Sequence, residues 1–195
     1  MKQRFLHPPS SVAEVLADLL RIAGLVSVVV AAIAWTASDA GVLAFVLLGL
    51  VIPRFLGMRA LLDVLSGATL LVAGWSSVID VYSRIGWWDL AVHFLGGGVV
   101  AAMSYLLFVR LGWLPGPRQT TAVAVVVLAT VIGLAGGAVW ELLEWLGHTF
   151  IDSAIFVDYD DTIGDMALGG LGSVAAGVLL VLLRTPWRRD AEPRA

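Results

Sequence analysis

The sequence predicts an all-α protein: a polytopic membrane helix bundle of about six transmembrane helices, with the N- and C-termini both in the cytoplasm. Three observations lead to this prediction. Hydrophobic residues make up 59% of the 195 residues, with a mean hydropathy of +0.93, whereas soluble domains have roughly 45–50%. These residues fall into six runs. Nearly all of the basic residues fall on one side of those runs.

Each run is close to the roughly 20 residues that a helix needs to cross a bilayer. We expect spans at 18–36, 41–57, 60–80, 89–110, 120–148 and 162–184. Pro53 and Arg54 interrupt the second run, so this span is expected to be short or kinked. Residues 8–21 carry apolar residues at helical spacing and are expected to lie along the inner membrane surface before the first span.

The orientation follows from lysine and arginine, which are retained on the cytoplasmic side of short loops. With six spans and a cytoplasmic N-terminus, Arg84 alone lies outside. The other basic residues lie inside: Lys2, Arg4, Arg21, Arg54, Arg59, Arg110, Arg118, Arg184, Arg188, Arg189 and Arg194. The predicted organisation is therefore a cytoplasmic segment at 1–17, a six-helix transmembrane domain at 18–184 and a basic cytoplasmic tail at 185–195.

Acidic residues have the opposite distribution. Ten of the 15 lie at or beyond the outer ends of the predicted helices: Asp39, Asp80, Asp89, Glu141, Glu144, Asp152, Asp158, Asp160, Asp161 and Asp165. Three pairs have the spacing of one helix face: Asp89 with His93, Glu141 with Glu144, and Asp161 with Asp165. Because all three pairs lie near the outer ends of successive spans, we expect them at a similar depth.

Five carboxylates that converge without a basic neighbour repel one another. Either some are protonated and hydrogen-bonded together, or a divalent cation lies among them. One imidazole with several carboxylates suits Mg²⁺, Mn²⁺, Fe²⁺ or Zn²⁺. We predict four metal ligands: His93, Glu141, Glu144 and Asp165. Asp89 or Asp161 would serve as a general base, or Asp89 would orient His93.

Simpler roles remain open for several of these residues. Asp89 and Asp161 open their helices, where aspartate is a common cap. His148 is expected to be an ordinary interfacial residue. Four tryptophans fit an aromatic belt at the outer interface: Trp87, Trp88, Trp140 and Trp145. Five small residues are spaced for close helix packing in lipid: Gly133, Gly137, Gly169, Ser173 and Gly177.

Three segments, "WWDLAVHFLGGG", "GAVWELLEW" and "DYDDTIGDMALGGLGS", together resemble the YjdF family of bacterial inner-membrane proteins. That family has Asp-x-x-x-His-Phe, Glu-x-x-Glu-Trp and Asp-Thr-x-x-Asp-Met in this order. The aligned positions are Asp89, His93, Glu141, Glu144, Asp161, Thr162 and Asp165. VanZ-like proteins carry a looser version, and their link to glycopeptide resistance suggests the cell envelope. The resemblance, over residues 80–180, implies a place in the bacterial plasma (inner) membrane and no particular reaction.

Three functions stay open, so the sequence leaves undecided whether the chain is an enzyme. One is a metal-dependent hydrolase or transferase acting on lipid or envelope precursors. Another is a small cation- or proton-coupled transporter, although no inverted repeat is visible. The third is a non-catalytic envelope or assembly protein with a structural acidic cluster. A pI of about 5.5 and the lack of a basic stripe indicate no nucleic-acid partner. The absence of cysteine excludes thiolate chemistry.

Overall fold

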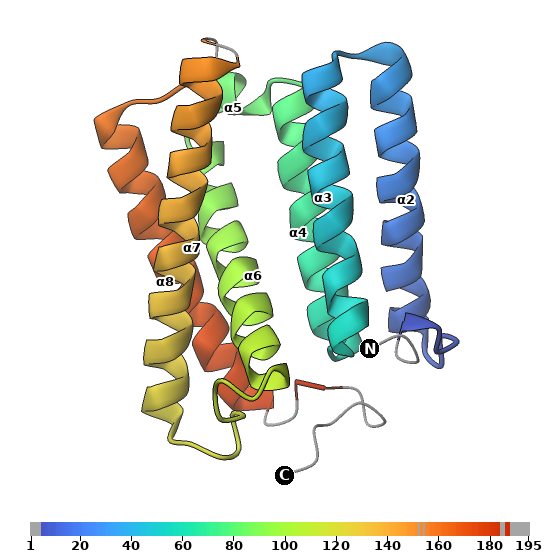
Figure 1. Cartoon of the computed structure of the whole chain (residues 1–195), viewed down its shortest axis with the longest axis vertical. Coiled ribbons are helices and arrows are strands. Elements are labelled where there is room, and N and C mark those ends of the chain that lie inside the picture. Colours follow the sequence, from blue (N-terminus) through green and yellow to red (C-terminus); the bar gives the residue numbers. More distant parts are fainter. Residues whose placement is uncertain (1–4, 152, 154, 184–185, 188–195) are drawn as a thin grey trace. The chain divides into compact units, whose positions relative to one another are not determined.

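The computed structural model describes residues 5–151, 153, 155–183, 186 and 187. Over these residues the chain forms seven helices and no strand (Figure 1). They are α2 (Val12–Ala34), α3 (Ala37–Leu56), α4 (Ala60–Val78), α5 (Val81–Arg84), α6 (Trp88–Arg110), α7 (Ala122–Phe150) and α8 (Tyr159–Leu183). All except α5 are long and apolar enough to cross a membrane. The predicted six-span, all-α bundle is confirmed, and such spans imply contact with the lipid bilayer.

The first helix begins earlier than the predicted span. Helix α2 starts at Val12 and continues without a break, so residues 12–21 form no separate helix. The place of residues 8–21 along the inner membrane surface stays a prediction. Ser11 caps the helix, because its hydroxyl accepts the Glu14 N–H at 3.3 Å. The Glu14 carboxylate in turn accepts the Ser10 N–H at 2.8 Å. The chain therefore specifies a helix start at this point.

The second span was predicted to be short or kinked, and a short helix is not found. Helix α3 has 20 residues and passes through Pro53, which lies in its last turn. It ends at Gly57, whose φ of 67° lies in the left-handed region that glycine adopts without strain. The Gly57 N–H donates to the Arg54 carbonyl, and the Met58 N–H donates to the Pro53 carbonyl at 3.0 Å. These bonds close the helix one residue after Leu56.

The described residues divide into two compact units. Helices α2 to α5, with Pro186 and Trp187, belong to the first, and α6 to α8 form the second. The short helix α5 is not predicted by the sequence. The single transmembrane domain at 18–184 and its flanking segments stay predictions. Several residues used for the orientation lie outside the described residues: Lys2, Arg4, Asp152, Arg184 and the tail 188–195.

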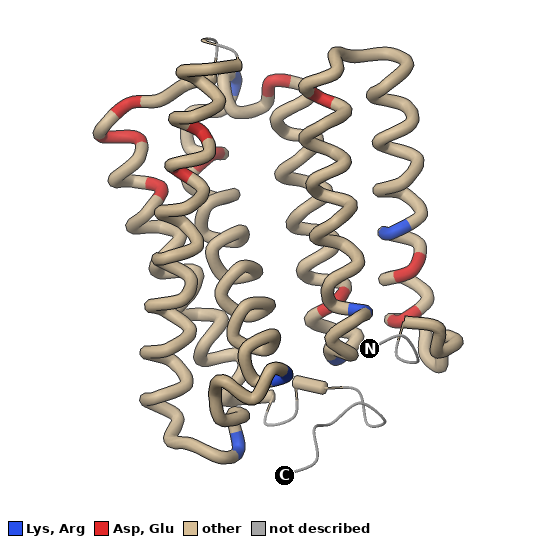
Figure 2. The backbone as a smooth tube through the Cα atoms, viewed as in Figure 1, with Lys and Arg blue, Asp and Glu red and all other residues tan. Residues whose placement is uncertain are grey.

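Ion pairs between buried or half-buried side chains join the three long helices of the first unit, which carry both acidic and basic residues toward one end (Figure 2). Arg21 of α2 contacts both carboxylate oxygens of Asp63 in α4, at 2.6 and 2.8 Å. It also contacts Asp18 at 3.0 Å, and Arg54 of α3 lies 3.3 Å from the same Asp18 oxygen. A charge buried in an apolar unit is tolerated only when it is paired. This network therefore explains how helices with the length and composition of membrane spans can contain charged residues.

In the second unit, α6 and α8 approach until their backbones touch. A Cβ placed on Gly97 would lie 2.5 Å from the Cα of Gly169, closer than real Cβ atoms come. A Cβ placed on Gly172 would overlap the carbonyl oxygen of Phe94. We call the contact formed by Gly97, Gly98, Gly169 and Gly172 the glycine seam. Close approach of this kind drives helix association in lipid.

Ser173 links the seam to its neighbours. Its hydroxyl lies 2.7 Å from the Gly169 carbonyl and 3.1 Å from the Gly97 carbonyl, so one donor serves both helices. Gly133 of α7 faces Ser173, where a Cβ would collide with the hydroxyl. The packing predicted for Gly133, Gly169 and Ser173 is confirmed. Gly137 is an exception, because nothing would lie within 4 Å of its Cβ.

Candidate metal centre

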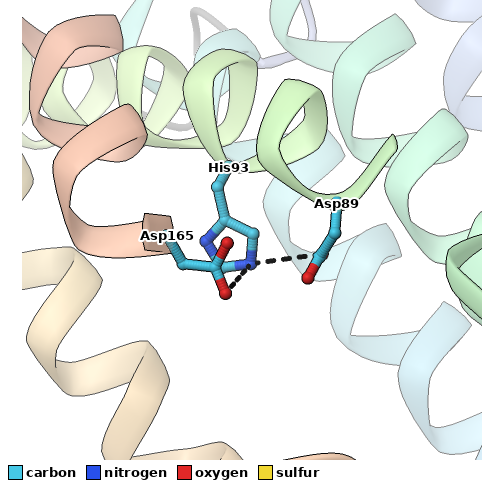
Figure 3. A group of neighbouring side chains, drawn as sticks. All are labelled: Asp89, His93 and Asp165. Carbon is cyan, nitrogen blue, oxygen red and sulfur yellow. Dashed lines mark ion pairs between the residues drawn. The ribbon is translucent and has the colours of Figure 1, made fainter. Parts of the chain in front are cut away.

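Three side chains from two helices meet near the start of α6 (Figure 3). Asp89 and His93 lie on successive turns of α6, and Asp165 lies on α8. The Nε2 of His93 is 3.5 Å from Asp89 Oδ1 and 3.6 Å from Asp165 Oδ2. One ligand atom from each residue lies within 4.8 Å of the other two. The three residues therefore present a compact set of nitrogen and oxygen ligands.

The geometry differs from that of a hydrogen-bonded histidine. Both carboxylates face the same ring nitrogen, which has either one hydrogen or one lone pair to offer. Both distances also exceed the roughly 2.7–3.2 Å of a good hydrogen bond. Ligands held about 2.1 Å from a tetrahedral ion lie about 3.4 Å from one another. The observed spacing is close to that of atoms arranged around a shared ion.

Burial distinguishes the three ligands. The Asp165 side chain is 2% exposed, against 15% for His93 and 30% for Asp89. Within the described part of the chain, Asp165 Oδ1 has no hydrogen-bond partner. A buried carboxylate oxygen without a donor is costly, and a cation is one way to compensate it. The group is therefore closed on the Asp165 side and more open on the Asp89 side.

The glycine seam determines how closely the ligands approach. Gly97 lies one helical turn after His93, and Gly169 lies one turn after Asp165. The two helices touch at these glycines, so the preceding turns that carry the ligands are also held close together. A side chain at Gly97 would collide with the backbone of Gly169, separate the helices and widen the distance between His93 and Asp165.

The predicted ligands Glu141 and Glu144, and the predicted base Asp161, lie outside this group of three. They are near it, because Asp165 interacts electrostatically with Asp161 and Glu141, and Glu144 with Asp165. The Oε1 atom of Glu141 is buried without a hydrogen-bond partner among the described residues. The structure thus brings the predicted ligands His93 and Asp165 together with Asp89, and it places the α7 acids beside them.

No described basic residue of the second unit lies near these acids. Arg110 ends α6, about 30 Å along the helix from Asp89, and Arg118 follows in the loop to α7. Figure 2 shows the acids of α6 to α8 at one end of the unit and the basic residues at the other. The acidic cluster, defined as Asp89, Glu141, Glu144, Asp161 and Asp165, therefore has no neutralising side chain within the described part of this unit.

A family model described as "Predicted membrane protein (DUF2238)" matches residues 14–186, which is most of the chain. The chain belongs to this family. YjdF is a member of the same DUF2238 family, so the resemblance noted in the sequence agrees with this finding. The looser VanZ-like resemblance stays a prediction. No curated protein and no solved structure matches the chain.

In this DUF2238 protein, helix capping does not account for Asp89 or Asp161. Helix α6 begins after Trp87 without any side-chain cap, so Asp89 is not used in that way. At the start of α8, the Asp158 carboxylate accepts the Asp160 N–H at 3.0 Å. Asp158, which the sequence suggested was merely an outer acid, therefore satisfies this helix end.

His148 has a structural contact. Its Nδ1 lies 2.6 Å from the Ile155 carbonyl oxygen, and because a carbonyl only accepts, Nδ1 must donate. This bond ties the end of α7 to the segment before α8. Trp87, Trp140 and Trp145 are 63%, 41% and 50% exposed, which suits a belt better than the wall of a pocket. The indole of Trp140 is also hydrogen-bonded to Glu144.

The sequence did not single out Gly97, Gly98 or Gly172 as residues of the site. A signal was present, because Gly97 follows His93 by four residues and Gly169 follows Asp165 by four. Ligands on one turn and glycines on the next are what two helices need when they cross next to a site.

Proposed function

We propose that this multi-pass membrane protein binds a divalent cation through Asp89, His93 and Asp165, and uses it for hydrolysis or group transfer on a lipid or envelope precursor. The observation that supports this most is the convergence of three ligand atoms within 4.8 Å, with two carboxylates facing one imidazole nitrogen. The chemistry of the ligands suits Mg²⁺, Mn²⁺, Fe²⁺ or Zn²⁺. This set exchanges Asp89 for the Glu141 and Glu144 expected from the sequence.

When bound, such an ion polarises a substrate oxygen and makes water a stronger nucleophile. The residues around it have separate tasks. Asp165 is almost fully buried, so its carboxylate would keep one orientation toward the ion. Asp89 and His93 are more exposed and would lie on the side from which the substrate enters. Asp161 is half-buried and interacts with Asp89 and Glu141, which supports the proposal that its carboxylate accepts a proton from the nucleophile.

Two observations favour this function over its alternatives. A purely structural acidic cluster would satisfy its buried oxygens internally, whereas Asp165 Oδ1 and Glu141 Oε1 have no partner among the described residues. A transport site would be expected near the middle of the spans. Asp89 lies instead in the first turn of α6, and Asp165 lies within the first two turns of α8.

We also propose the location and orientation. The resemblance to YjdF supports a place in the bacterial plasma (inner) membrane. The distribution of lysine and arginine supports both termini in the cytoplasm, so the site would open to the extracytoplasmic face. The VanZ-like resemblance agrees with a role in the cell envelope.

Substituting His93 with alanine is expected to weaken Mn²⁺ binding by at least about 100-fold, because one of three convergent ligands is lost. The measurement is isothermal titration calorimetry of the purified protein in detergent. His148→Gln is the matched control, since His148 lies in the same unit but contacts a backbone carbonyl. Absence of Mn²⁺ binding to the unsubstituted protein, or an equal loss in both variants, would contradict the proposed site.

Catalysis is tested separately with bacterial membrane lipids. Incubation of the Mn²⁺-loaded protein with a total lipid extract is expected to convert a defined lipid class, detected by mass spectrometry, and Asp161→Asn is expected to slow this conversion at least about 100-fold. If the protein binds the metal but converts no lipid or envelope precursor, the enzymatic role is refuted and the proposed ion site is not.

The orientation can be measured with single cysteines, because the chain has none of its own. A cysteine at Phe156, between α7 and α8, is expected to react in intact spheroplasts with a reagent that cannot cross the membrane. A cysteine at Gln119, between α6 and α7, is expected to react only after lysis. Both positions are exposed, so neither cysteine would be hidden inside the protein. The reverse pattern would exclude a cytoplasmic N-terminus.

A further inference from the structure

Two carboxylate oxygens in the acidic cluster lie outside the contacts made with His93. One is Oδ1 of Asp165, whose other oxygen faces the imidazole. The second is Oε1 of Glu141, on the neighbouring helix α7. Both atoms are buried, and within the described residues neither has a hydrogen-bond partner. Because ionised carboxylates only accept hydrogen bonds, the two oxygens cannot satisfy one another.

The two carboxylates are neighbours in an unbalanced cluster. Asp165 interacts electrostatically with Asp89, Asp161 and Glu141, and Glu144 interacts with Glu141. When ionised, the five acids of the cluster carry five negative charges. One divalent ion at Asp89, His93 and Asp165 leaves three, and the described basic residues of this unit lie at its other end. A single ion therefore does not neutralise the site.

We propose that a second divalent cation binds between α7 and α8, held by Asp165 Oδ1 and Glu141 Oε1, with Glu144 beside it. Asp165 is then a carboxylate shared by two ions, one oxygen for each. This inference rests on the proposed function, because it takes the first ion as given. Helix bundles build two-ion sites from carboxylates on facing helices, and bridged ions lie about 3.5–4 Å apart.

The second ion would give the buried oxygens of Glu141 and Asp165 the partner that they lack among the described residues. It also gives Glu141 and Glu144 a role, although neither belongs to the group of three ligands. Both lie three residues apart on one face of α7, so the same helix turn offers two carboxylates. The alternative is that protons, instead of a cation, compensate these acids.

Metal stoichiometry decides between these possibilities. After equilibration with Mn²⁺ and removal of free metal, the unsubstituted protein is expected to hold two Mn²⁺ per chain by plasma mass spectrometry. Electron paramagnetic resonance is expected to show a spin-coupled pair. Glu141→Gln, which keeps the shape and removes the charge, is expected to hold one ion with the signal of isolated Mn²⁺. Asp160→Asn is the control, an exposed acid of α8 that should retain two.

Each outcome has one meaning. One ion per chain in the unsubstituted protein, with an uncoupled signal, overturns the second site and leaves the first intact. No ion overturns the proposed function itself. Two ions that persist in Glu141→Gln overturn the assignment to Glu141. The spectrum of the unsubstituted protein needs no variant, so the test holds even if Glu141→Gln fails to fold.

Discussion

Gly172→Ala lowers the stability of the second unit by about 3 kcal/mol or more, the upper end of the cost of overpacking. The added Cβ would overlap the Phe94 carbonyl oxygen and lie 2.7 Å from the carbonyl carbon and 3.2 Å from the Gly98 nitrogen. All three atoms belong to backbone, so no side-chain rotation relieves the collision, and α6 must move away from α8. In a chain of this size the melting temperature should fall by about 6–12 °C.

The measurement is thermal unfolding in detergent, with Gly96→Ala as the control. Gly96 lies in α6, but nothing is found within 4 Å of a Cβ built on it. Alanine is a better helix former than glycine by about 0.5–1 kcal/mol, so Gly96→Ala should leave stability unchanged or slightly higher. Equal melting temperatures for the two variants would mean that the seam does not hold these helices. Mn²⁺ affinity should also fall in Gly172→Ala, because the seam positions His93 and Asp165.

Arg21→Met is expected to destabilise the first unit by about 3–5 kcal/mol, the cost of leaving a buried charge without its partner. Asp63 is 10% exposed and would lose the guanidinium that contacts both of its oxygens. Adding Asp63→Leu should recover most of this loss, because an apolar pair replaces the ion pair and no orphaned charge remains at that point. The comparison of single and double variants measures the coupling between the two residues.

The control for this experiment is Arg84→Met. Arg84 is exposed in α5 and lies in the same unit, so its removal should change the free energy of unfolding by less than about 0.5 kcal/mol. If Arg21→Met were no more destabilising than Arg84→Met, or if the double variant were as unstable as Arg21→Met alone, the network would not stabilise the helices.

The spans could be predicted because bilayer thickness sets the length of an apolar run, and this property is local in sequence. The helices differ from the prediction where a residue's partner is distant in sequence. Arg21 and Asp18 marked the end of an expected surface segment, but α2 runs through both, and Arg21 pairs with Asp63, 42 residues further along the chain. The predicted break at Pro53 also did not shorten α3, because the proline lies in its last turn.

The site was predictable in part for a related reason. Helical spacing places His93 on the same face as Asp89, and Asp165 on the same face as Asp161, and it does so independently of how the helices pack. Spacing within a helix says nothing about its rotation toward a neighbour. The assignment of Glu141 and Glu144 as ligands beside His93 therefore stays a prediction, while the structure shows Asp89 in that place.

The sequence alone determined that this protein has six membrane-spanning helices and that three of them carry acids toward the same end, two of these with a histidine as well. These properties depend on the composition and periodicity of each helix, and neither depends on how that helix packs against the others. Only the tertiary structure decided which side chains meet, because that depends on how α6 and α8 face each other. Their facing surfaces are set by Gly97 and Gly172, where the absence of a side chain allows two backbones to touch.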